Sequence, residues 1–68
     1  MRIADDLQRQ IESGKIPPGA KLPGELELSE AYRVSAGTVR RAVRELRERG
    51  LVATLAAKGT YVVDQAAE

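Results

Sequence analysis

The sequence contains no cysteine, no histidine, no tryptophan and no phenylalanine among its 68 residues. Without cysteine, neither a disulfide framework nor a thiolate metal site can form. Without histidine, the usual general base and the usual zinc ligand are also missing, so we expect no metal, no cofactor and no enzymatic activity. No wholly apolar run exceeds three residues, which is far too short for a transmembrane helix. These absences predict a soluble, cytoplasmic chain with no membrane partner.

The net charge of +1 hides an uneven distribution of charge along the chain. Residues 1–30 hold four basic and six acidic side chains, whereas residues 31–63 hold seven basic and two acidic ones. A basic half of this kind favours an anionic partner. The alternative is an arginine-rich helix face that is simply solvated, in which Glu45 and Glu48 are the i, i+4 partners of Arg41 and Arg44.

Apolar residues at every fourth position predict an amphipathic helix over residues 2–13. Gly14 follows where a left-handed C-terminal cap belongs, and the prolines and glycine of residues 17–19 cannot continue the helix. Residues 20–22 are then expected to form a short extended segment before the next Pro-Gly pair.

Two further helices are expected, over residues 25–32 and 36–49. Acidic residues open the first of them, and Ser35 is a good N-cap for the second. The expected buried positions are Leu28, Ala31 and Tyr32 on the first, and Val39, Ala42, Val43 and Leu46 on the second. Residues 51–55 and 60–63 are rich in β-formers and predict a two-stranded hairpin.

The short connection between the second and third expected helices is typical of a helix-turn-helix. One stripe of the later helix is buried against the earlier one, so its first turn and outer face stay free for a DNA major groove. Hydroxyl and amide groups at a helix start suit phosphate, and arginines reach phosphates or guanine edges. The residues left for DNA by this geometry are Ser35, Gly37, Thr38, Arg40, Arg41 and Arg44.

Residues 3–63 resemble the winged-helix DNA-binding domain of the GntR family of bacterial transcription regulators. The segments that carry the resemblance are Ile3-Ala4, Ile11-Glu12-Ser13-Gly14, Pro17-Pro18-Gly19-Ala20-Lys21-Leu22-Pro23, Val34-Ser35, Thr38-Val39-Arg40, Gly50-Leu51-Val52 and Gly59-Thr60-Tyr61-Val62. The resemblance implies a mainly α fold with a small β-wing (α+β), a three-helix winged helix-turn-helix. It places one domain over residues 1–63, with the helix-turn-helix at about 25–44, the wing at about 51–63 and a tail at 64–68.

The resemblance also implies a mode of action and a set of contacts. The third helix would enter the major groove of double-stranded DNA, and the wing would lie on the adjacent backbone or minor groove. Ser35, Thr38 and Arg40 match positions that family members use on DNA, and Lys58 and Gly59 match the wing tip. Family members carry a C-terminal domain that binds an effector and dimerises, for which 68 residues leave no room. The chain is therefore expected to belong to a longer regulator or to form a homodimer in another way.

Several positions depart from the family pattern. Gly24 replaces a usual serine, Leu26 and Ala36 replace usual arginines, and Ala57 replaces a usual glycine in the wing. The strand residues 53–56 are also less polar than usual. These changes support a second hypothesis, in which the winged helix is a protein-interaction module with weakened or lost base-specific reading of DNA.

Overall fold

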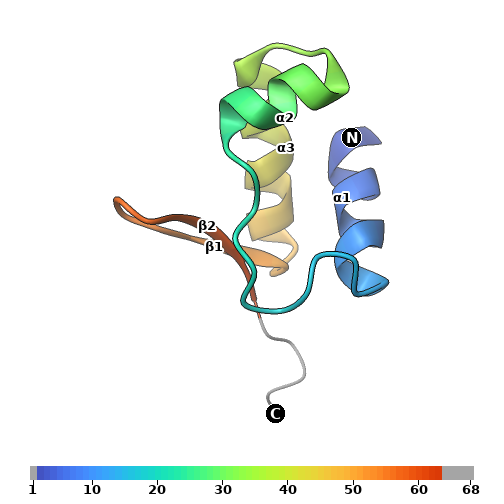
Figure 1. Ribbon diagram of the computed structural model, residues 1–68, viewed down its shortest axis with the longest axis vertical. Coiled ribbons are helices and arrows are strands. Elements are labelled where there is room, and N and C mark those ends of the chain that lie inside the picture. Colours follow the sequence, from blue (N-terminus) through green and yellow to red (C-terminus); the bar gives the residue numbers. More distant parts are fainter. Residues whose placement is uncertain (1, 64–68) are drawn as a thin grey trace.

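The computed structural model describes residues 2–63, which form three helices followed by a two-stranded antiparallel hairpin (Figure 1). The elements are α1 (Arg2–Glu12), α2 (Glu25–Tyr32), α3 (Ala36–Glu48), β1 (Val52–Leu55) and β2 (Gly59–Val62). The element order and the fold class are as predicted, and the ends of the elements shift by one residue at most. The expected tail at 64–68 lies outside the described residues. None of the described helices has the length and apolar character needed to cross a membrane.

The core forms where the three helices meet the base of the hairpin. Val39, Ala42 and Leu46 on α3 have no exposed surface, and they pack with Ala4 and Leu7 of α1. Figure 1 shows α1 beside α3, with α2 at the top of the view. Because α3 is buried against both other helices on one side, its opposite side remains free.

Three of the expected buried positions are wrong or only partly right, because Tyr32 too is only half-buried. Ala31 is exposed, and Val43 is only half-buried. Leu28 is the buried residue of α2, while Tyr32 turns toward α1 and bonds Asp6. α2 therefore packs mainly on α3 and contacts α1 through Tyr32, while Ala31 stays in solvent.

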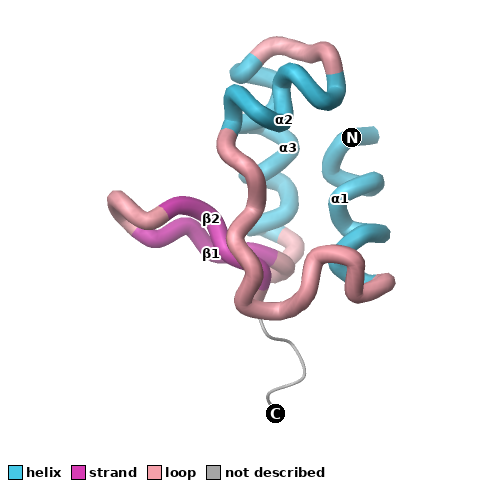
Figure 2. The backbone as a smooth tube through the Cα atoms, in the orientation of Figure 1, coloured by secondary structure: helices cyan, strands magenta, loops and turns pink. Residues whose placement is uncertain are grey.

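The hairpin extends away from the helices and is held at its base by the loop that precedes α2 (Figure 2). Strand pairing runs from Val52 opposite Val62 to Leu55 opposite Gly59. The Leu22 N–H donates to the Thr60 carbonyl at 2.8 Å, and the Val62 N–H donates to the Ala20 carbonyl at 2.9 Å. The extended segment predicted at residues 20–22 thus covers the outer edge of β2, which fixes where the hairpin leaves the body.

Candidate nucleic-acid interface

The N-terminal turn of α3 is capped as the sequence predicts. The Ser35 Oγ accepts the N–H of Thr38 at 3.2 Å, and the two side-chain hydroxyls lie 3.0 Å apart. The N–H groups of Ala36 and Gly37 are in the first turn, where no carbonyl of the helix can accept them. This end of α3 therefore presents backbone donors and the positive end of the helix dipole to an anion.

Three arginines follow one another along the outer face of α3. Arg40, Arg44 and Arg47 are spaced by four and three residues, so they share one stripe of the helix. Arg40 forms an ion pair with Glu25 at the start of α2, with 3.1 Å between Nη1 and Oε1. Arg41 is also exposed, but it is rotated about 100° from Arg40 around the helix axis.

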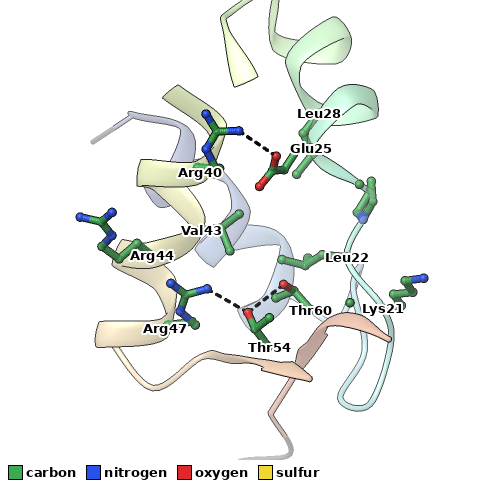
Figure 3. A pocket seen from close by; sticks show the side chains of 13 residues that line it. Lys21, Leu22, Glu25, Leu28, Arg40, Val43, Arg44, Arg47, Thr54 and Thr60 are labelled. Carbon is green, nitrogen blue, oxygen red and sulfur yellow. Dashed lines mark hydrogen bonds and ion pairs between the residues drawn. The ribbon is translucent and has the colours of Figure 1, made fainter. Parts of the chain in front are cut away.

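Figure 3 shows that this stripe forms one wall of a groove of about 370 Å³. The other walls are the start of α2, the loop before it and the inner face of the wing. Its floor is apolar, with Leu22, Leu28 and Val43 pointing inward, and the Arg40–Glu25 pair closes one end. At the other end, the Arg47 Nη1 donates to the Thr54 Oγ1 at 2.9 Å. Glu25 is the only acid that lines the groove among the described residues, against Lys21, Arg40, Arg44 and Arg47.

The structure separates the predicted site residues into groups. Arg40, Arg44 and Gly59 line the groove. Ser35, Gly37 and Thr38 lie at the N-terminal end of α3. The residues outside the groove are Arg41, on the flank of α3, and Lys58, in the exposed hairpin turn.

Gly59 has a structural reason to be glycine. Its φ of 110° is a conformation that side chains rarely adopt, and a Cβ there would lie 2.7 Å from the Cε of Lys21. The Lys21 side chain can lie across the wing because position 59 carries no side chain.

Among the residues that line the groove, the sequence prediction missed four with side-chain hydrogen-bond donors, namely Lys21, Arg47, Thr54 and Thr60. The signal for Arg47 was present, since it lies one turn after Arg44 on the same stripe, but the helix-turn-helix was predicted to end at residue 44. The positions of Lys21 and the two threonines depend on how the loop and hairpin fold back on α3, which no local pattern encodes.

Arg49 belongs to the basic half of the chain but faces the body of the protein. It forms ion pairs with Asp5 of α1, at 3.1 Å, and with Glu45 of its own helix. It also donates to Gln8 at 2.6 Å. Glu45 thus forms an i, i+4 ion pair with Arg49, an arginine that also contacts α1.

A second hollow, of about 580 Å³, lies on another side of the molecule where α1 meets the end of α2 and the start of α3. There the Tyr32 hydroxyl donates to the Asp6 carboxylate. Burial and this hydrogen bond raise the pKa of Tyr32 to about 12, and the same bond lowers the pKa of Asp6. The pair joins α1 to α2 and has no connection to the groove.

The family model for bacterial regulatory proteins of the gntR family matches residues 1–62. The chain belongs to the GntR family. This membership agrees with the observed winged helix-turn-helix and with the resemblance carried by the sequence motifs.

Named relatives of the GntR-family chain are bacterial regulators. The mannosyl-D-glycerate transport/metabolism system repressor MngR of Escherichia coli (strain K12) is 39% identical over 64 residues, which cover 94% of this chain and 27% of that protein. The transcriptional repressor NagR of Bacillus subtilis (strain 168) is 38% identical over 61 residues, covering 90% and 25%. The chain thus spans about a quarter of the length of these relatives.

Solved GntR-type structures share the fold. The DNA-binding domain of AraR in complex with operator ORX1 aligns with a TM-score of 0.87 and 34% identity, covering 91% of this chain and 75% of that one. A GntR family transcriptional regulator from Listeria monocytogenes aligns with a TM-score of 0.90 and 28% identity, covering 96% and 57%.

Proposed function

We propose that this chain is the DNA-binding module of a transcription regulator, with α3 in the major groove of duplex DNA and the wing on the adjacent backbone or minor groove. The observation that carries the proposal is the groove face, where an arginine stripe on α3, the start of α2 and the wing meet on one side of the molecule. A solved relative, the AraR DNA-binding domain, has this fold and is bound to operator DNA.

The predicted residues receive different roles in this arrangement. Ser35, Gly37 and Thr38 place the start of α3 against a phosphate, because the first turn has backbone donors to spare. Arg40 and Arg44 lie on the outer face of α3 and are the candidates for base edges or phosphates. The remaining candidates, for backbone contacts only, are Arg41, Lys58 and Gly59.

The way a helix-turn-helix reads DNA suggests that this chain acts as part of a dimer. One helix-turn-helix reads a single half-site, so useful affinity needs a second copy on an adjacent half-site. Since the curated relatives are about four times as long as the matched region, we assign effector binding and homodimerisation to a further domain of a longer regulator.

Salt dependence of DNA binding tests the proposal. The affinity for a random-sequence duplex should fall steeply between about 50 and 200 mM salt, with a log–log slope of about −0.9 per phosphate neutralised. Fluorescence anisotropy at several salt concentrations measures that slope. An affinity that does not change with salt, or no binding to any duplex, would contradict the proposal.

A second candidate function rests on exposed apolar side chains. Leu26 on α2 is 72% exposed and Leu55 near the wing tip is 50% exposed, and both lie where DNA contacts are expected. Such residues suit a protein-interaction module better than a phosphate backbone.

The substitution Ala36→Arg discriminates between the two functions. Position 36 is in the first turn of α3 and partly exposed, so an arginine there would reach DNA if this face binds it. We expect the affinity for duplex DNA to rise about tenfold, in line with one added charge-assisted contact. The same charge added by Ser13→Arg, in the exposed turn after α1 and outside the groove, is the control. Equal effects from both variants would favour the interaction module.

A further inference from the structure

The groove contains a cation that is held in place by a hydrogen bond but is not neutralised. The Arg47 guanidinium donates to the Thr54 hydroxyl across the gap between α3 and β1, and among the described residues it forms no ion pair. Three other arginines, Arg9, Arg40 and Arg49, are each paired with a carboxylate. Because its partner is a neutral hydroxyl, Arg47 keeps its full charge while its position is fixed.

The hydroxyl groups of the wing add a spare hydrogen-bond donor. Thr54 and Thr60 face each other across the two strands, with 3.0 Å between their oxygens. Thr54 already accepts from Arg47, and one hydroxyl proton is used between the two threonines. Each threonine carries one O–H, so one proton of the pair is left without an acceptor among the described residues.

The donors at this end of the groove therefore exceed the acceptors. A guanidinium has five N–H groups, of which Thr54 takes one. Arg44, one turn earlier on α3, lines the same groove, and no carboxylate pairs with it among the described residues. The ligand that satisfies several N–H and O–H donors around a net positive charge is an oxyanion.

We infer that Arg47, Thr54 and Thr60 form a binding site for one phosphate of the DNA backbone between α3 and the wing, with the positive charge of Arg44 one turn away on α3. This inference rests on the proposed function, because a DNA strand would pass the base of the wing only if α3 lies in the major groove. Arg47 has two tasks in it. Its charge binds the phosphate, and its bond to Thr54 sets the position of the wing relative to α3.

The test compares salt slopes measured by anisotropy on random-sequence duplexes. Arg47→Gln is expected to reduce the magnitude of the log–log slope by about 0.9, the contribution of one phosphate, and to weaken binding equally on every duplex sequence. Arg47→Lys keeps the charge and should keep the slope. The matched control is Lys15→Gln, which removes the same charge from an exposed residue of the loop after α1 that does not line the groove. Lys15→Gln should leave the slope within error.

Thr54→Val separates the two tasks of Arg47. It removes the bond to Arg47 without changing charge, so affinity should fall several-fold while the slope stays that of the wild type.

An Arg47→Gln slope no different from that of Lys15→Gln would overturn the site. Equal loss of slope in Thr54→Val and Arg47→Gln would also overturn it, since wing position alone would then explain both. A wild-type chain without salt-dependent binding would instead overturn the proposed function, and the site with it. Thermal unfolding of each variant checks that its fold is intact.

Discussion

Ala57, in the turn between β1 and β2, adopts a backbone conformation that suits glycine. Its φ is 63°, and the N–H of Lys58 closes the turn on the carbonyl of Leu55 at 3.1 Å. A positive φ at the third position of such a turn normally requires glycine or asparagine. The wing of this protein thus contains local strain at position 57, where alanine replaces the glycine of the family pattern.

We expect Ala57→Gly to stabilise the protein by about 0.5–1 kcal/mol. A left-handed conformation costs an L-residue about 1–2 kcal/mol, and the extra freedom of glycine in the unfolded chain offsets about 0.4–1 kcal/mol of the gain. Urea unfolding measures the difference. Ala56→Gly is the control, because Ala56 has no positive φ and its replacement should only destabilise. Equal effects from the two glycines would contradict the strain at position 57.

At the scale of the elements, the helix ends follow local rules closely. Ser35 caps α3 with its own hydroxyl, whereas Gly24 begins α2 without a side-chain cap. These features could be predicted from the sequence because a cap depends on neighbours within three or four residues. The exposure of Ala31 could not be predicted in this way, since it depends on how α2 packs on α3.

Removal of the α3 cap should weaken the whole fold. Ser35→Ala is expected to lower the free energy of unfolding by about 1 kcal/mol, and Ser35→Gly by only a few tenths of a kcal/mol, since glycine is a better N-cap than alanine. Chemical denaturation of both variants measures this order. A Ser35→Ala variant as stable as the wild type would show that the cap bond observed at 3.2 Å contributes nothing.

At the scale of the whole molecule, polar contacts fix α1 to the helix-turn-helix on the side away from the groove. Arg49 reaches Asp5 and Gln8 from α3, and Tyr32 reaches Asp6 from α2. These residues are far apart in sequence, and their pairing was not predicted. Within the basic half of the chain, Arg49 therefore stabilises the fold, whereas Arg40, Arg44 and Arg47 line the groove.

Burial of Tyr32 and its hydrogen bond to Asp6 make stability fall at high pH. The pKa of Tyr32 is about 12 in the folded protein against an ordinary value of 10.0, so its contribution is complete below about pH 10 and is lost as the pH rises toward 12. Two pKa units set an upper bound of about 2.7 kcal/mol, which solvent reduces at this partly exposed site. Thermal unfolding of wild type and Tyr32→Phe at a series of pH values tests this. The stability gap between them should narrow above pH 10, and a constant gap would contradict the assignment.

The sequence by itself determined the elements, their caps, the buried stripe of α3 and the family. Each of these depends on spacing within a few residues or on motifs in a fixed order, and both are written directly in the chain. Residues 20–22 were correctly expected to be extended, but pairing with β2 gave that segment its role at the wing base. Only the tertiary structure decided which cations are available. Arg49 pairs with Asp5 of α1, Arg40 forms an exposed ion pair with Glu25, and Arg47 bonds a wing threonine and has no carboxylate partner among the described residues. The net charge of +1 could not show this, because the charge that remains on one face of the protein depends on which side chains folding brings together.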